Sequence, residues 1–297
     1  MLKDLKIREV HLGLSYRCNM SCKHCFTAHA SGSFIQKEKV FQLLDQLLEL
    51  GIYRIYYTYG EPILAENFFE IVSYAKKNNF FQILLTNGFY LYDDNLVKKI
   101  KKSGIDYVSV SIDSSNKNKH DSNRNKKNSF DYAMKALENL HNNSMSFGIG
   151  TTVTNDNVNE INEIYKIAIE KKCNSISFLT ERKNCKLCTI FGLEDAVYKL
   201  ISNQKNKKKP IILFHDVNLI SVFKKLYEEK IIDLNEYIFY KEMCMCHSLK
   251  NSLSIDPDGN VFGCNYSSKS IGNIYKNSLA SILNDSVDAD SDNCIRE

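Results

Sequence analysis

Three cysteines near the start of the chain, Cys18, Cys22 and Cys25, have a spacing that could do chemistry. They stand in the stretch YRCNMSCKHCFT, with three residues between the first two and two residues between the second and third. One interpretation is thiols that only pack, and another is a zinc site with His24 or His29 as its fourth ligand. A third is a cubane iron–sulfur cluster held by three thiolates, whose fourth iron takes a ligand from outside the protein.

The loop that carries these cysteines follows the first of six strand-like runs. Because these runs alternate with helix-like segments, the pattern predicts a parallel sheet with helices outside it. The expected strands are residues 10–16, 53–60, 81–88, 106–113, 145–154 and 174–182, and the expected helices are 37–51, 65–79, 93–104, 129–143 and 158–172. Ligands bind at the carboxyl ends of such strands, where the cysteine loop, YGEP, TNG and SID all fall.

The C-x3-C-x2-C pattern directly after a first strand resembles the signature of the radical S-adenosylmethionine (SAM) superfamily, and the resemblance covers the whole chain in order. It implies a partial (β/α)6 TIM-like barrel over residues 1–182, with a [4Fe–4S] cluster on the three cysteines. It also implies that the amino and carboxylate groups of SAM chelate the fourth iron. The reaction implied is reductive cleavage of SAM to a 5′-deoxyadenosyl radical, which abstracts hydrogen from a substrate.

The same resemblance implies a set of residues that contact SAM: His24, Gly60, Glu61, Pro62, Asn87, Ser111 and Arg124. His24 stands where the family usually has an aromatic residue near the adenine. YTYGEP resembles the family's GGEP, but Tyr59 replaces the first glycine, which is expected to alter the SAM contacts or the pocket shape. Arg124 lies in HDSNRNKKNSF, where Asn125 and Asn128 replace two family glycines. Because asparagine tolerates the left-handed backbone, we expect this loop to survive.

A second cysteine set lies near the end of the chain. Cys246, Gly259 and Cys264 fit C-x(9–15)-G-x4-C, which resembles the SPASM/Twitch extension of the same superfamily. Such extensions bind auxiliary [4Fe–4S] clusters. We therefore expect residues 183–297 to form a small α+β C-terminal extension, with a β-hairpin over residues 252–264.

The expected ligands of the auxiliary cluster are Cys244, Cys246, Cys264 and Cys294. A full SPASM domain has more cysteines than this, so we expect a shortened version with one auxiliary cluster. Cys185 and Cys188 form a C-x2-C pair with three interpretations: further ligands, a thiol that donates hydrogen to a substrate radical, or unligated surface thiols. Cys173 falls late in an expected helix and is interpreted as a core residue.

Composition limits the location and the function class. No apolar run is long enough to span a membrane, and the N-terminus lacks the pattern of a signal peptide. We therefore expect a cytoplasmic protein, in which ten cysteines favour metal or redox chemistry over disulfides. The net charge of +4 comes largely from basic runs at 116–128 and 203–210. These runs lack interleaved aromatic residues, so we interpret them as solvated loops and expect no nucleic-acid partner.

The resemblance also bears on the substrate. Relatives with such extensions commonly modify ribosomally made peptides or proteins, by crosslinking, oxidation or epimerisation. A barrel that begins by residue 10 leaves no room for an N-terminal peptide-binding domain, so a leader peptide is expected on the barrel, the extension or a separate partner. An electron donor such as flavodoxin or ferredoxin is also implied. The alternatives are an oxidoreductase acting on a small molecule, such as an amino sugar or cofactor precursor, and a non-catalytic metal- or nucleic-acid-binding protein.

Overall fold

The computed structural model describes residues 6–27, 34–183, 186–204 and 210–286. The strands of its main sheet are β1 (Glu9–Gly13), β2 (Arg54–Thr58), β3 (Phe81–Thr86), β4 (Tyr107–Ser111), β5 (Ser146–Val153), β6 (Ser175–Thr180), β9 (Ile211–Phe214), β10 (Ser252–Ile255), β11 (Asn260–Phe262) and β12 (Gly272–Asn273). Within the described residues they form one ten-stranded sheet in the order β12-β11-β10-β1-β2-β3-β4-β5-β6-β9. From β10 through β1 to β9, neighbouring strands pair in parallel.

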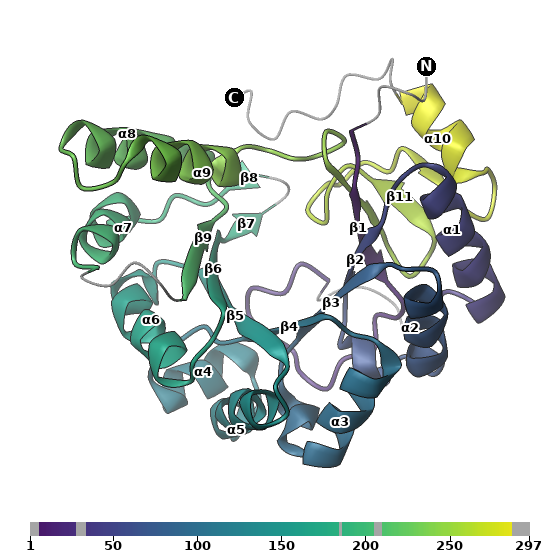
Figure 1. The fold of residues 1–297 in the computed structure, drawn as a ribbon, viewed down its shortest axis with the longest axis horizontal. Helices are drawn as coiled ribbons and strands as arrows, with labels where there is room; N and C mark the ends of the chain where they lie inside the picture. Colours follow the sequence, from purple (N-terminus) through teal and green to yellow (C-terminus); the bar gives the residue numbers. More distant parts are fainter. Residues whose placement is uncertain (1–5, 28–33, 184–185, 205–209, 287–297) are drawn as a thin grey trace.

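Helices cover the outer face of this curved sheet, as Figure 1 shows. They are α1 (Lys37–Glu49), α2 (Phe68–Lys77), α3 (Asp94–Ser103), α4 (Lys117–Arg124), α5 (Ser129–Asn142), α6 (Ile161–Glu170), α7 (Leu193–Ser202), α8 (Ile220–Glu228), α9 (Leu234–Cys244) and α10 (Leu279–Ser286). Single 3₁₀ turns are η2 (Pro62–Leu64), η3 (Phe89–Tyr92), η4 (Val158–Glu160) and η5 (Val217–Leu219), and a separate small hairpin joins β7 (Arg182–Lys183) to β8 (Lys186–Leu187).

The helices form because their apolar residues recur at helical spacing. In α1 the buried residues are Val40, Leu43, Leu44 and Leu47, which lie on one face of the helix and pack against the sheet. The helix α3 ends where Gly104 adopts a left-handed conformation with φ of 113°, as expected from its C-cap position. The expected α/β fold, a partial barrel of alternating strands and helices, is thus confirmed.

Two sequence expectations outside the six strands are wrong. The strand–helix alternation does not stop at residue 182, because β9 pairs in parallel with β6 between α7 and α8. Its run IILF is four residues long and directly follows the basic run at 203–210, so its sequence pattern does not identify it as a strand. The basic run at 116–128 is not a solvated loop. It contains α4, which Asn116 caps by accepting a hydrogen bond from the Lys119 backbone N–H at 3.1 Å.

The C-terminal strands continue the same sheet. The hairpin expected over residues 252–264 is confirmed, since β10 and β11 pair in antiparallel fashion. In addition, β10 pairs in parallel with β1, with Glu9 opposite Ser252 and Leu12 opposite Ile255. The division into residues 1–182 and 183–297 stays a prediction.

None of the described helices combines the length and the apolar character that crossing a bilayer requires.

Candidate functional site

The first cysteine loop is held against α4 by hydrogen bonds on both of its sides. The Lys23 backbone N–H donates to the Asn123 carbonyl at 2.9 Å, and the Asn125 side chain donates to Ser21 Oγ at 2.9 Å. Within the loop, the Cys25 N–H donates to the Cys22 carbonyl at 3.2 Å. The loop between β1 and α1 is therefore positioned by the segment that follows β4.

Three thiols lie on the first cysteine loop. Cys18 is exposed, and Cys22 and Cys25 are half-buried. Among the described residues, no three His, Cys, Asp or Glu side chains converge on one metal position. In an iron–sulfur cube each thiolate binds its own iron, so three thiols can hold such a cluster. Three thiols on one short loop therefore fit the cluster that the sequence predicts.

A buried ion pair lies beneath this loop. Arg124 Nη2 is 2.6 Å from Asp113 Oδ2, and His24 Nε2 is 3.4 Å from the same oxygen. Arg124 Nη1 also donates to Cys22 Sγ at 3.7 Å. Burial alone would raise the pKa of Asp113, but Arg124 and His24 lower it overall, so this carboxylate stays ionised. Arg124 thus contacts Asp113 and Cys22, and its expected contact with SAM stays a prediction.

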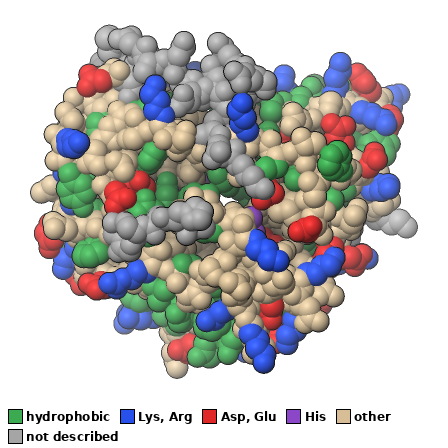
Figure 2. Space-filling view, turned by 180° about the vertical axis from the view of Figure 1, so that it is seen from behind, with side chains coloured by type: hydrophobic (Ala, Val, Ile, Leu, Met, Phe, Trp, Pro, Cys, Tyr) green, Lys and Arg blue, Asp and Glu red, His purple; other side chains and the backbone are tan. Residues whose placement is uncertain are grey.

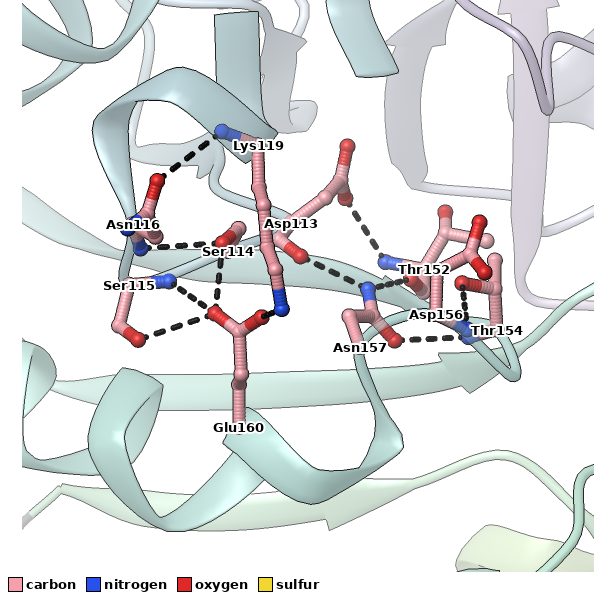
Figure 3. A network of polar contacts seen from close by, with 10 residues as sticks. All are labelled: Asp113, Ser114, Ser115, Asn116, Lys119, Thr152, Thr154, Asp156, Asn157 and Glu160. Atoms are coloured by element: carbon pink, nitrogen blue, oxygen red, sulfur yellow. Dashed lines mark hydrogen bonds and ion pairs between the residues drawn. The ribbon is translucent and has the colours of Figure 1, made fainter. Parts of the chain in front are cut away.

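Hydrogen bonds from residues after β4, in β5 and beside η4 hold Asp113 in place, as Figure 3 shows. Asp113 Oδ1 accepts from the Thr152 N–H at 3.1 Å, and the Asp113 carbonyl accepts from Asn157 Nδ2 at 2.7 Å. One turn further on, Glu160 accepts from Ser114 Oγ at 2.6 Å. The residues come from the ends of β4 and β5 and from η4, so the network ties neighbouring strand ends together.

The two asparagines that follow Arg124 adopt the left-handed conformation, as predicted. Asn125 has φ of 48° and ends α4, and Asn128 has φ of 63° and precedes α5. Asp121 stabilises this turn, since its carboxylate accepts from the backbone N–H groups of Asn128 at 2.7 Å and Phe130 at 2.9 Å. The loop thus has a left-handed residue at both positions where the family pattern has glycine.

Gly60 lets the end of β2 approach the start of the cysteine loop. Its φ is 47°, and a Cβ atom there would lie 2.4 Å from the Arg17 carbonyl and 2.8 Å from the Ser15 carbonyl. The next residue, Glu61, donates its N–H to the Arg17 carbonyl at 2.8 Å. Any other residue at position 60 would force these two backbones apart.

The Glu61 carboxylate is buried and turns toward β3. It accepts from Thr86 Oγ1 at 2.8 Å and from the Asn87 N–H at 2.9 Å. Burial raises its pKa to about 7, although these hydrogen bonds act in the opposite direction. Pro62, which follows, is buried and begins η2. Glu61 therefore links the segment after β2 to the end of β3.

The remaining predicted SAM contacts, Asn87 and Ser111, lie at the carboxyl ends of β3 and β4. Asn87 Nδ2 donates to Asn19 Oδ1 at 2.8 Å and lies 4.0 Å from Cys18 Sγ. Ser111 ends β4 half-buried, opposite Gly150 of β5. The structure thus brings the ends of β1 to β4 around the first cysteine loop.

Tyr59 fills the space between that loop and the C-terminal strands. It is 7% exposed, has a left-handed φ of 60°, and its hydroxyl is hydrogen-bonded to Ser254 Oγ of β10 at 2.8 Å. Its ring packs against Phe26 with centroids 5.2 Å apart. A Cβ on Gly13 would lie 2.7 Å from this ring, so glycine makes room for it. Tyr16 makes a parallel link, donating to Asp256 Oδ2 at 3.0 Å.

The second cysteine set is more dispersed. Cys244 ends α9, is buried, and its thiol lies 3.8 Å from the Phe214 carbonyl, where burial raises its pKa to about 12. Cys246 and Cys264 are half-buried, as is Cys188, which follows β8. Cys185 and Cys294 lie outside the described residues. Cys173 is buried in the core, as predicted.

Sequence reasoning missed the side chains that line the barrel opposite this rim. His11 of β1 stacks on Tyr56 with centroids 4.6 Å apart, and its Nδ1 lies 3.2 Å from Asn265 Nδ2. Figure 2 shows a hollow near the centre of the molecule with a histidine at its margin. An isolated histidine within a strand run carries no motif. The one available signal was the alternation of side chains along a strand. It places His11 on the face opposite Val10 and Leu12, which is the inner face of the sheet.

Comparison with known families matches both cysteine regions. Residues 12–168 match the Radical SAM superfamily, and residues 244–294 match SPASM, an iron–sulfur cluster-binding domain. These two domains imply a SAM-binding [4Fe–4S] cluster and an auxiliary iron–sulfur cluster.

Individual relatives differ in how much of the chain they match. The Fe-coproporphyrin III synthase of Methanosarcina barkeri is 30% identical over 56% of this chain and 42% of its own length. The subtilosin biosynthesis protein AlbA of Bacillus subtilis is 27% identical over 91% of this chain and 58% of its own. The chain thus spans about half the length of these curated relatives. Streptococcus suis SuiB, solved with the precursor peptide SuiA, shares the fold with a TM-score of 0.76 at 15% identity, covering 95% of this chain and 66% of SuiB.

Proposed function

Because the chain belongs to the radical SAM superfamily, we propose that it cleaves S-adenosylmethionine reductively and modifies a ribosomally made peptide or protein. The extent of the match to AlbA carries the peptide part of this proposal. That match covers 91% of the chain, barrel and C-terminal region alike, whereas the match to the Fe-coproporphyrin III synthase covers 56%. The modification is a crosslink, another oxidation or an epimerisation.

The two cysteine regions are the proposed cluster sites. Cys18, Cys22 and Cys25 would hold the SAM-binding cluster. The auxiliary cluster would use Cys246 and Cys264, with Cys244, Cys294, Cys185 and Cys188 as further candidates. When bound, the first cluster supplies the electron that splits SAM into a carbon radical able to take hydrogen from an unactivated C–H bond.

The chain's own residues supply placement and exclusion of water. Gly60 brings the β2 end close to the cysteine loop, where backbone groups can approach SAM. Asn87 lies beside Cys18 at the end of β3. His24 and Arg124 contact Asp113 at the end of β4. Tyr59 is 7% exposed, and its buried ring keeps water out of the space that it fills beside the cysteine loop. We assign SAM contacts to His24, Gly60, Glu61, Pro62, Asn87, Ser111 and Arg124.

The reaction needs a one-electron donor, for which we propose flavodoxin or ferredoxin in the cytoplasm. Lys23 and Lys127 are exposed beside the cysteine loop and α4, and would attract an acidic donor to this rim. A separate peptide-recognition partner is compatible with the same arrangement.

A second candidate is an oxidoreductase that acts on a small cofactor precursor. The 30% identity to the Fe-coproporphyrin III synthase favours it. That match covers about half of this chain, so it speaks for the SAM-cleaving chemistry more than for the substrate.

The test uses anaerobically reconstituted protein with SAM, a reductant and peptides encoded by short reading frames beside the gene. Wild type should release 5′-deoxyadenosine and change the mass or chirality of one such peptide. In deuterated water, deuterium fixed at an α-carbon indicates epimerisation, and a loss of two hydrogens indicates crosslinking. The variant with Cys18, Cys22 and Cys25 replaced by alanine should release no 5′-deoxyadenosine. The control Cys173→Ala removes a core thiol and should retain cleavage, and persistent cleavage by the triple variant would refute the site.

A further inference from the structure

Arg182 lies at the mouth of the barrel, two residues beyond the carboxyl end of β6, where TIM-like barrels bind ligands. Its guanidinium carbon is 5.5 Å from the centroid of the Tyr266 ring. The Tyr266 ring in turn packs against Phe26, with centroids 5.4 Å apart, and Phe26 directly follows Cys25. Two aromatic rings therefore connect this arginine to the first cysteine loop.

Arg182 forms no ion pair with a carboxylate of the described part of the chain. Arg17, Arg54 and Arg124 each pair with a carboxylate, whereas Arg182 is half-buried and pairs with none of the described carboxylates. The positive charge of Arg182 also acts on the imidazole of His215. Burial above all, then His247 and Arg182, lower the pKa of His215 to about 4, so its imidazole is neutral near pH 7. Arg182 thus places a half-buried positive charge over the Tyr266 ring, beside a neutral imidazole.

The chemistry of this arginine favours a planar anion. A guanidinium stacked on an aromatic ring keeps its N–H groups free in the plane, and that fork matches the two oxygens of a carboxylate. Partial burial strengthens such a pair relative to one in open water. Peptides carry carboxylates on aspartate and glutamate side chains and at the C-terminus.

We propose that Arg182, stacked on Tyr266, binds a carboxylate of the peptide substrate. This inference rests on the peptide-modifying function proposed above and names the substrate feature that the barrel mouth selects. Because Tyr266 and Phe26 lead from Arg182 to Cys25, an anchored carboxylate fixes which neighbouring residue of the peptide faces the first cysteine loop. Peptides that carry an acidic group at a fixed distance from the modified residue are then the preferred substrates.

The experiment measures binding of small carboxylate probes to the anaerobically reconstituted holoprotein. Saturating SAM is present, so that the probes do not bind at the fourth iron. The probes are N-acetylglutamic acid α-amide, which has a side-chain carboxylate, N-acetylglycine, which has a terminal one, and the neutral N-acetylglutamine α-amide. Titration calorimetry compares wild type with Arg182→Gln, Arg182→Lys and the control Lys186→Gln, which removes an exposed positive charge from the same hairpin.

We expect wild type to bind at least one carboxylate probe about tenfold more tightly than the neutral amide, which corresponds to about 1.4 kcal/mol. The probe with the higher affinity identifies the source of the carboxylate. Arg182→Gln should abolish the preference, Arg182→Lys should keep part of it, and Lys186→Gln should keep all of it. Equal binding of acid and amide by wild type, an unchanged preference in Arg182→Gln, or an equal loss in Lys186→Gln would overturn the inference.

The same variants separate this inference from the proposed function. Release of 5′-deoxyadenosine from SAM without peptide is measured for wild type, Arg182→Gln and the control Lys186→Gln, and the control should cleave SAM at the wild-type rate. If the carboxylate preference holds but no peptide is modified, the anion site stands and the peptide function fails. If peptides are modified without any carboxylate preference, the function stands and the anion site fails.

Discussion

The two cysteine regions of this chain are held in place by different kinds of interaction. The loop with Cys18, Cys22 and Cys25 is fixed by hydrogen bonds to α4 and by the buried Arg124–Asp113 ion pair beneath it. The hairpin that leads to Cys264 is fixed by strand pairing between β10 and β1. Side chains add to that pairing, with Tyr16 on Asp256 and Tyr59 on Ser254.

This difference teaches that the two sites can fail separately. The first depends on the buried Arg124–Asp113 pair, and a single substitution can leave one of these two charges without its partner. The second depends on several contacts between residues more than 190 positions apart in sequence. Substitutions in one region should therefore leave the other region's iron in place.

The largest expected effect that separates the regions comes from replacing both Cys246 and Cys264 by alanine. This variant should lose the auxiliary cluster, so that its iron content falls by about half for two cubane clusters. The first cluster should keep the spectral change that SAM binding causes. Iron analysis and electron paramagnetic resonance with and without SAM measure both. An unchanged iron content would show that these thiols bind no cluster.

Arg124→Gln should be the most destabilising change at the first site. It leaves Asp113 buried with an uncompensated charge, and removing one partner of a buried pair costs about 3 kcal/mol or more in unfolding free energy. The first cluster should also be retained less well. Arg54→Gln is the control, because Arg54 and Glu9 form a more exposed pair that contributes about 1 kcal/mol or less. Equal losses in urea unfolding for the two variants would contradict this view of the ion pair.

Tyr59→Phe tests the link between the regions with one atom. Losing the hydroxyl on Ser254 should cost about 1.5 kcal/mol and speed amide hydrogen exchange in β10 and β11. Tyr57→Phe is the matched control, since Tyr57 of β2, two residues before Tyr59, donates to Gln82 Oε1 of β3 at 2.7 Å. It should cost a similar amount without affecting exchange in β10. Identical exchange patterns would rule out a special role for Tyr59.

The smallest expected effect is a pH dependence that belongs to the first region alone. The pKa of Glu61 is raised from 4.5 to about 7, so the folded state binds its proton more tightly than the unfolded state does. The contribution of Glu61 to stability is therefore largest below pH 4.5 and is lost as the pH rises through about 7. Between pH 6 and pH 8, wild type should lose about 1 kcal/mol relative to Glu61→Gln. Urea unfolding at both pH values measures this, and Glu66→Gln, at an exposed position, should show no such difference.

The sequence predicts the barrel well because its strands and helices are locally encoded. The strand runs alternate with amphipathic segments such as α1, whose apolar spacing needs no knowledge of the rest of the chain. The left-handed Asn125 and Asn128 were likewise predictable from backbone preference alone. The cysteine spacing and GEP gave the place of the site at the strand ends.

What the sequence did not reveal depends on contacts between distant residues. Nothing in DSSNKNKH shows that it forms a helix whose arginine is buried on Asp113, because burial of Arg124 follows from the strand ends around it. The role of Tyr59 as a link to Ser254 required knowing that β10 lies beside β1. Arg182 carries no motif, and its position over Tyr266 emerges only when residues 84 positions apart meet.

The pairing of β1 with β10 has a consequence for synthesis of the chain on the ribosome. Glu9 pairs with Ser252, so one edge of the first strand has no hydrogen-bonding partner from β10 until more than 240 further residues have been made. Such a distant pairing slows folding, and an open strand edge invites aggregation in the meantime. During that interval the nascent barrel stays open on the side where the first cysteine loop begins.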